Sequence, residues 1–228
     1  MENLNGNDVH TPTKSLEAIT ILDQDASLLH LMTIIRNANT DHRDFCSAVE
    51  KVVRRLVSTA LNHIPIEPYT ITTPVNTTYR GVRFTKGVCG VSILRAGTSM
   101  EQILRETWMG PLRFGKLLIQ RDETTCRAEI YYCKLPHQIT NDVVLLLEPM
   151  LATGGSVIKA VEALKAHGVA EDSIVLVNVI SSQPGLDVVS QKYPYMKIVL
   201  AAVDQELNPK KYISPGLGDF GDRYYGTC

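Results

Sequence analysis

One run of small and polar residues in the sequence has the composition of a loop that surrounds a bound anion. It lies between an apolar stretch typical of a buried strand and a stretch with helical spacing, and it consists of Glu148, Pro149, Met150, Leu151, Ala152, Thr153, Gly154, Gly155 and Ser156. At such a junction the N–H groups of the first helical turn have no partner within the helix, and glycines let a ligand approach the backbone closely. The run therefore predicts a site for a small anion, with an ordinary helix cap as the alternative.

A carboxylate opens this run. Glu148 stands at the expected carboxyl end of the strand, where open α/β sheets bind their ligands, and a carboxylate can accept hydrogen bonds from vicinal sugar hydroxyls. An anion site beside such a carboxylate suggests a ribose phosphate. The run contains neither the Walker A pattern nor the G-x-G-x-x-G dinucleotide pattern, so NTP hydrolysis and NAD binding lose their main support.

Two arginines could bind further negative charge. Arg95 follows an apolar strand and precedes Ala96 and Gly97, which leave room for a ligand near the backbone. Arg121 begins the polar segment RDETTCRA, a candidate hairpin connection. Both have a simpler interpretation: Arg95 as a surface residue at a strand end, and Arg121 as a solvated hairpin charge paired with a neighbouring acid.

The segment YISPGLGDFGD, residues 212–222, alternates stiff and permissive residues. Proline fixes the backbone and glycine frees it, so the chain can fold tightly around a flat ligand. Its polar side chain of interest is Asp219. A structural Gly/Pro turn is the alternative.

The composition limits what these motifs can serve. The chain has 228 residues, of which 44% are hydrophobic and 21% charged, as expected of one globular domain. A net charge of -1 gives no attraction for an extended polyanion, and no apolar run reaches the length of a membrane span, so we expect no nucleic-acid or membrane partner. Five cysteines without a C-x-x-C pair, behind a polar start with no apolar signal segment, predict reduced thiols and a cytoplasmic protein.

Apolar spacing predicts the elements that position the motifs. Helices are expected at residues 41–62, 99–108, 156–167 and 186–193, and strands at 69–72, 82–85, 88–94, 114–120, 129–133, 143–147, 173–180 and 197–203. Their alternation predicts an α/β fold: a single domain with a mostly parallel central sheet flanked by helices. We place the domain at residues 25–228, behind a polar arm of residues 1–24. The runs around RDETTCRA are expected to form a mobile hairpin, and the aromatic residues after Asn208 predict an ordered tail.

Four segments together resemble the uracil phosphoribosyltransferase family of type I phosphoribosyltransferases. They are CGVSILRAGTSME, LIQRDETT, LLLEPMLATGGS and PGLGDFGDRYYGT, which occur in the family's order. Most members have Asp where Glu148 stands, whereas Pro149 is shared by the uracil enzymes and favours the narrower assignment. The resemblance extends weakly through the N-terminal helices, and it implies the type I fold with a β-hairpin lid, a cis peptide in the Arg95 loop and a C-terminal base-binding segment.

The resemblance also implies a reaction: uracil and 5-phospho-α-D-ribose 1-diphosphate (PRPP) give UMP and diphosphate in pyrimidine salvage. It assigns PRPP binding to Arg95, Arg121, residues 148–156 and Asp219, and uracil binding to Ile213, Gly218, Asp219 and Phe220, largely through main chain. Asp219 is then the catalytic candidate, acting on a proton, on the metal or on the ribosyl cation. Mg²⁺ is the expected cofactor, held mainly by oxygens of PRPP and not by the protein.

Other interpretations remain open at this stage. A non-catalytic relative could bind uracil or a nucleotide and regulate a partner, and a phosphoribosyltransferase for another base would keep the same fold. The resemblance implies a homodimer or homotetramer and GTP as a candidate effector. The region that corresponds to the GTP site of such relatives includes His42, Lys51 and Arg113. Asp142 stands where GTP-responsive relatives carry a basic residue.

Overall fold

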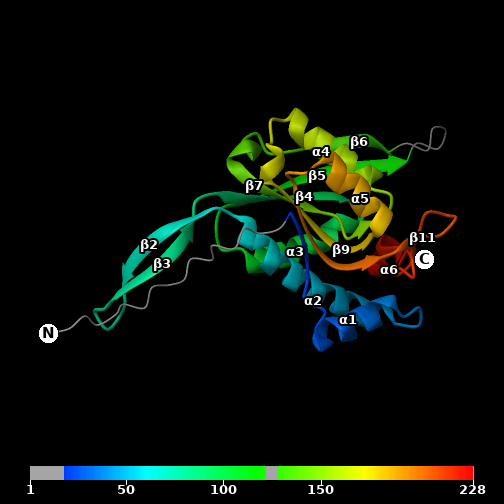
Figure 1. Cartoon of the computed structure of the whole chain (residues 1–228), viewed down its shortest axis with the longest axis horizontal. Helices are drawn as coiled ribbons and strands as arrows, with labels where there is room; N and C mark the ends of the chain where they lie inside the picture. Colours follow the sequence, from blue (N-terminus) through cyan, green and yellow to red (C-terminus); the bar gives the residue numbers. More distant parts are fainter. Residues whose placement is uncertain (1–17, 122–127, 228) are drawn as a thin grey trace.

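The computed structural model of the chain describes residues 18–121 and 128–227 (Figure 1). Eight strands of this described part form one sheet, in the order β1-β10-β9-β7-β4-β5-β6, with β8 beside β9. Their bounds are β1 Ile19–Ile21, β4 Gly87–Leu94, β5 Leu112–Arg121, β6 Ala128–Lys134, β7 Asp142–Leu147, β8 Met150–Leu151, β9 Ile174–Ser182 and β10 Lys197–Asp204. Within this sheet, only β5 and β6 pair in antiparallel orientation, and all the other pairs are parallel. The predicted single α/β domain with a mostly parallel sheet is confirmed.

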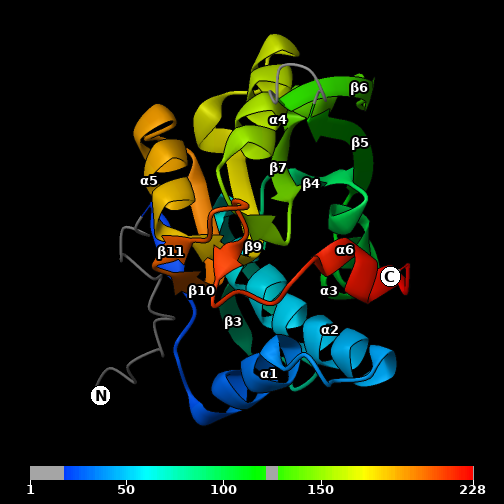
Figure 2. The same ribbon diagram turned by 90° about the vertical axis from the view of Figure 1, so that its right-hand side faces the viewer.

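Helices cover both faces of this sheet (Figure 2). One face packs against α1 (Ala26–Arg36), α2 (His42–Ala60) and α3 (Glu101–Thr107), and the other against α4 (Gly155–Ala166) and α5 (Gln183–Lys192). Side chains alternate between the two faces along a strand, so Leu145 and Leu147 of β7 enter the first core while Val144 and Leu146 enter the second. Burial on both faces explains why the central strands read as continuous apolar runs.

The long helix α2 confirms the sequence prediction closely. Its N-cap is Asp41, whose carboxylate accepts a hydrogen bond from the Asp44 N–H at 2.8 Å. The apolar residues predicted from their spacing are buried against the sheet. The predicted helices 99–108, 156–167 and 186–193 likewise correspond to α3, α4 and α5.

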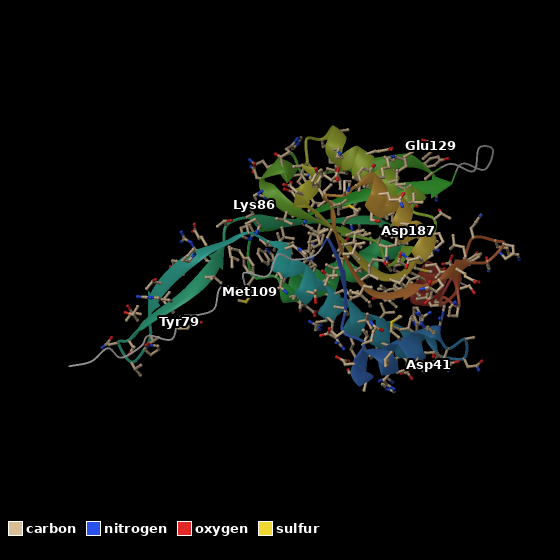
Figure 3. All side chains as sticks on the ribbon, in the orientation of Figure 1. Asp41, Tyr79, Lys86, Met109, Glu129 and Asp187 are labelled. Atoms are coloured by element: carbon tan, nitrogen blue, oxygen red, sulfur yellow. The ribbon has the colours of Figure 1, made fainter. Side chains whose placement is uncertain are left out.

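The strands β2 (Ile66–Thr72) and β3 (Thr78–Phe84) form an antiparallel hairpin of their own that extends away from the body. Figure 3 places Tyr79 far out on it and Lys86 near its base. The strands predicted at residues 69–72 and 82–85 correspond to β2 and β3. The two pair with each other along their length and do not belong to the eight-stranded sheet, whereas the sequence prediction placed all the strands in one central sheet.

The predicted polar arm, residues 1–24, includes part of the sheet. Strand β1 lies parallel to β10, with Ile19 opposite Ile198 and Ile21 opposite Leu200, and Leu22 is buried. A strand of three residues is too short for a periodicity signal, and only its pairing with β10 reveals it. Residues 1–17 of the predicted arm lie outside the described residues.

The predicted hairpin between β5 and β6 is present in its two strands, which pair from Lys116 with Lys134 to Arg121 with Ala128. Its connection, residues 122–127, lies outside the described residues, so the mobile lid stays a prediction. Cys46, Cys89 and Cys133 carry free thiols, as expected, and Cys126 and Cys228 fall outside the described part. None of the described helices combines the length and apolar character needed to span a bilayer.

Candidate active site

The predicted motifs meet where the central parallel strands end. Arg95 follows the last residue of β4 and Glu148 the last residue of β7, and these two strands are neighbours. The loops after them are in direct contact, because a Cβ atom on Gly97 would lie 2.1 Å from the Leu147 carbonyl oxygen. Only glycine fits at position 97. The topology therefore brings two of the motifs, 53 residues apart from Arg95 to Glu148, to one edge of the sheet.

The run of residues 148–156 ends at an open helix N-terminus. Gly154 is the N-cap of α4 in the left-handed region (φ 82°) and carries no side chain to cap the helix. The N–H groups of Gly155, Ser156 and Val157 precede the first intrahelical bond, which the Ile158 N–H makes to the Gly154 carbonyl at 2.9 Å. They border a cavity of about 100 Å³ lined by residues 150–157. The cavity matches a small anion bound by backbone N–H groups.

Residues of β9 and of the first turn of α5 brace this loop, and the sequence prediction missed them. The Ser182 hydroxyl donates to the Ala152 carbonyl at 2.5 Å and accepts from the Gly185 N–H at 3.0 Å. A Cβ on Gly185 would lie 2.2 Å from the same carbonyl oxygen. Pro149 is tied to β9 as well, because its carbonyl accepts hydrogen bonds from Val179 and Ile180, each at 3.0 Å. The S-x-x-G spacing of Ser182 and Gly185 is the only sequence signal for this support.

Glu148 is buried at the floor of the site, with 8% of its surface exposed. Its Oε1 accepts one hydrogen bond, from the Met150 N–H at 3.3 Å. Burial raises the pKa of this carboxyl to about 8, so it is largely protonated at neutral pH and can both donate and accept hydrogen bonds. Asn178 holds the backbone beneath it by donating to the Glu148 carbonyl at 2.8 Å.

Arg95 reaches toward the C-terminal segment. The peptide between Leu94 and Arg95 is cis, as the resemblance implies. The Arg95 side chain is 56% exposed, and its guanidinium donates to the Asp222 carboxylate at 2.9 Å and to the Thr227 hydroxyl at 3.3 Å. Asp222 belongs to the short helix α6 (Phe220–Tyr225), which packs against α2 and the turn after β4 (Figure 2).

The predicted base-binding segment is a tight, ordered loop. It leaves the ribbon of β11 (Glu206–Leu207) and β12 (Ile213–Ser214), passes a cis bond before Pro215, and turns at Gly216 (φ 62°) and Gly218 (φ 83°). The buried Asp204 accepts a hydrogen bond from the Gly216 N–H at 2.7 Å. Arg36 donates to both oxygens of Asp204, at 2.7 and 2.8 Å, and to the Gly216 carbonyl at 2.9 Å. This anchor joins residues more than 160 positions apart, and no local pattern could have found it.

Asp219 is the exposed N-cap of α6. Its Oδ1 accepts a hydrogen bond from the Asp222 N–H at 2.9 Å. A Cβ atom on Gly221 would lie 3.4 Å from this oxygen and 3.5 Å from Nη2 of Arg95, so both predicted site residues lie next to Gly221. Within the described residues, no group of three or more His, Cys, Asp or Glu could hold a metal ion. The exposed Asp219 carboxylate fits a Mg²⁺ ion that brings most of its oxygen ligands with a phosphorylated substrate.

A family model described as uracil phosphoribosyltransferase matches residues 21–227. The chain belongs to the uracil phosphoribosyltransferase family. It is 48% identical to the uracil phosphoribosyltransferase of Dictyostelium discoideum over 211 residues, covering 92% of this chain and 97% of the relative. It is 46% identical to that of Saccharomyces cerevisiae over 207 residues, covering 91% and 95%. The solved structure of the AQ2163 protein from Aquifex aeolicus covers 91% of this chain with 97% of its own, at a TM-score of 0.79 and 31% identity.

Membership in the uracil phosphoribosyltransferase family makes the chain an enzyme, a pentosyltransferase. Its structure narrows how the predicted uracil residues could act. The side chains of Ile213 and Phe220 are buried in the core, Phe220 edge-on to Phe45 and stacked on Tyr224. These two side chains are therefore unavailable to a base, and uracil binding through the backbone at these positions stays a prediction. Arg121 ends β5, and its side chain lies outside what the structure describes.

Proposed function

We propose that the chain transfers the 5-phosphoribosyl group of PRPP to uracil, giving UMP and diphosphate in pyrimidine salvage. The observation that carries the proposal is the meeting, at one sheet edge, of the open N-terminus of α4, the Glu148 carboxyl and the Arg95–Asp219 pair of side chains. These groups match the phosphate, the ribose hydroxyls and the diphosphate of one substrate.

In this proposal the 5-phosphate of PRPP occupies the cavity at residues 150–157, bound by N–H groups and by the positive end of the α4 dipole. Glu148 meets the ribose 2- and 3-hydroxyls. A carboxyl in the floor of the site, supported by Asn178 and β9, suits this role. Arg95 and Arg121 bind the diphosphate through charge-assisted hydrogen bonds.

The reaction breaks the bond from C1 of ribose to the diphosphate oxygen, and the electron pair leaves with diphosphate. N1 of uracil forms the new bond to C1 and gives up its proton. Since C1 becomes cation-like on the way, the Asp219 carboxylate can stabilise that charge, and it could equally accept the proton or orient the metal. Mg²⁺ would offset the charge of the leaving diphosphate. Arg95 neutralises the same group from the β4 side.

Uracil recognition is assigned to backbone groups of the segment from Ile213 to Phe220. Uracil presents an acceptor, a donor and an acceptor along its edge, a pattern that backbone N–H and C=O groups can match. Cytosine presents a different pattern and would leave buried groups unpaired, each costing ~1–3 kcal/mol. The anchor of Arg36 and Asp204 supports this by holding Gly216 in place.

The remaining predictions concern regulation, assembly and location. The β2–β3 hairpin exposes Tyr69, Ile71, Tyr79, Val82 and Phe84, an apolar surface of the kind that oligomers cover, and this supports a homodimer or homotetramer. A measurement of the molecular mass in solution tests the oligomeric state. The free thiols of the described cysteines support a cytoplasmic enzyme.

GTP as an effector stays a prediction from the family resemblance. Arg113, one of the basic residues expected near GTP, already donates to both oxygens of Asp142 at 2.7 and 2.8 Å, and Lys51 donates to Ser47. Titrating GTP into the activity assay tests it directly.

The central experiment incubates the protein with uracil, PRPP and Mg²⁺ and measures UMP by chromatography. UMP formation is the expected result. A well-folded protein that binds uracil without forming UMP would point to the non-catalytic alternative. A panel of uracil, cytosine, orotate and hypoxanthine tests the base, and turnover with another base alone would contradict the substrate while retaining the fold.

A further inference from the structure

Within the described residues, the side-chain hydrogen bonds of the Arg95 guanidinium and its contact with an aromatic ring come from the C-terminal segment. Nη2 donates to Asp222 at 2.9 Å, Nη1 donates to Thr227 at 3.3 Å, and the guanidinium carbon lies 5.9 Å from the centre of the Tyr225 ring. Asp222 is the only carboxylate among these contacts. The orientation of Arg95 therefore depends on a helix more than 120 residues away in the sequence.

The same segment holds the backbone from which Arg95 projects. The Tyr225 hydroxyl donates to the Arg95 carbonyl at 3.2 Å, and Thr98, which bonds to the Tyr225 hydroxyl, donates to this carbonyl at 2.6 Å. The Thr227 hydroxyl in turn donates to Asp222 at 2.6 Å. Asp222 is thus itself oriented, so it can orient the guanidinium.

Asp222 also contacts the other predicted site residue. Its N–H donates to the Asp219 carboxylate at 2.9 Å, while its own carboxylate faces Arg95. One residue therefore sets the relative position of Asp219 and Arg95, which flank Gly221.

The electrostatics suit a positioning role. The hydrogen bonds from Thr227 and Arg95 lower the pKa of Asp222, which keeps it charged at neutral pH. Both partners of the ion pair are more than a third exposed, so the pair adds little to stability. An arginine has five N–H donors in a fixed plane, and these protein contacts use two, which leaves donors for a diphosphate.

We propose that Asp222 is a positioning residue for the reaction: it holds the Arg95 guanidinium in the orientation that binds the diphosphate of PRPP, beside Asp219. The inference rests on the proposed function and deepens it. It also connects the sites of the two substrates. Asp222 lies in α6, at the end of the base-binding segment, and its side chain positions the arginine that binds the diphosphate.

The test compares Asp222→Asn, Asp222→Glu and Arg95→Ala with the double variant Asp222→Asn/Arg95→Ala. Asp222→Asn should raise the KM for PRPP roughly tenfold or more, since small displacements of positioned groups cost one to two orders of magnitude. The KM for uracil should change less than about twofold, because the Asp222 carboxylate contacts Arg95, whereas the contact with Asp219 comes from the Asp222 backbone N–H, which the substitution keeps. Asp222→Glu, which keeps the charge, should recover part of the PRPP affinity.

Non-additivity is the decisive readout. If Asp222 acts through Arg95, adding Asp222→Asn to Arg95→Ala should change the KM for PRPP no further. Additive effects, or an unchanged KM in Asp222→Asn, would overturn the proposal. Glu67→Gln is the matched control, because Glu67 forms a similarly exposed pair with Arg83 on the β2–β3 hairpin, and it should leave both KM values unchanged.

Calorimetric binding of PRPP and Mg²⁺ keeps this test separate from the proposed function. Should the wild-type protein form no UMP, the function fails, yet weaker PRPP binding by Asp222→Asn would still support the positioning. If Asp222→Asn does not fold, the same binding measurement is made with Asp222→Glu and with Thr227→Val, which removes the hydrogen bond from Thr227 to the Asp222 carboxylate. Wild-type affinity for PRPP in both variants would refute the positioning role of Asp222.

Discussion

The two halves of the candidate site are built on different principles. The phosphate loop, residues 148–156, is made of consecutive residues between β7 and α4, and its key property is backbone geometry at a helix N-terminus. The base-binding segment, residues 213–222, takes its shape from distant partners: Arg36 and Asp204 hold Gly216, and Phe45 packs on Phe220. The comparison teaches that the anion-binding N–H groups of the phosphate loop come from its own backbone, which residues 30 positions away only brace, whereas the shape of the base-binding segment depends on partners far away in the sequence.

The largest expected effect tests the assembled half at its exposed carboxylate. Asp219→Asn should lower kcat by roughly 100-fold to 1,000-fold, since the variant removes the negative charge beside the reacting carbon. Asn also caps helices, so α6 should remain intact. Steady-state kinetics and circular dichroism measure both effects. An unchanged kcat would remove Asp219 from the chemistry.

The next effect tests the local half. Gly154→Ala should weaken PRPP binding by about 100-fold, because a side chain in the left-handed region is strained and its Cβ would lie 2.9 Å from the Val189 side chain, which displaces the loop. Gly168→Ala is the matched control: Gly168 has φ 84° at the other end of α4 and lies outside the site. PRPP titration calorimetry should show the loss only in Gly154→Ala, and equal losses would contradict a local origin.

Breaking a distant anchor should affect only the assembled half. Asp204→Asn removes the charge that pairs with Arg36 and weakens the acceptor of the Gly216 N–H. We expect a loss of about 1–3 kcal/mol in unfolding free energy and a raised KM for uracil, with the KM for PRPP nearly unchanged. Denaturant unfolding and kinetics measure these. Glu162→Gln, at an exposed pair with Lys192, is the control and should change neither the unfolding free energy nor the KM values. A similar rise in both KM values for Asp204→Asn would contradict the separation of the site into two halves.

The smallest effect concerns Glu148, the buried carboxyl of the local half, and its contribution to stability. Its pKa is raised from 4.5 to about 8, so the folded protein keeps a proton that the unfolded chain releases above pH 4.5. This residue therefore lowers stability progressively as pH rises from about 4.5 to about 8, and not below that range. Glu148→Gln should remove the dependence, gaining about 2 kcal/mol on wild type between pH 5 and pH 7. Urea unfolding at both pH values measures it, and a constant difference would contradict the raised pKa.

The elements with strong periodicity were predictable because their burial is regular. The helix of residues 41–62 repeats its apolar residues at helical spacing because one face of it is buried. The strand of residues 143–147 is continuously apolar because both of its faces are buried. Strand β1 and the pairing of β2 with β3 as a separate hairpin were not, because pairing partners decide whether a short apolar run joins a sheet, pairs with a neighbouring run or stays unpaired. At the site, the loop of residues 148–156 was found, while its brace at Ser182 and Gly185 was missed.

By itself the sequence determined the α/β fold class, the anion-binding loop and, through four ordered motifs, the family. These depend on local backbone chemistry, in which neighbouring residue types dictate conformation and burial. Tertiary structure alone decided that Arg95 lies beside Asp219, that Asp222 joins them, that Arg36 and Asp204 anchor the base-binding loop, and that Glu148 is buried enough to hold its proton. The physical reason is that charge pairing and desolvation depend on distance in space, which the order of residues along a chain does not contain.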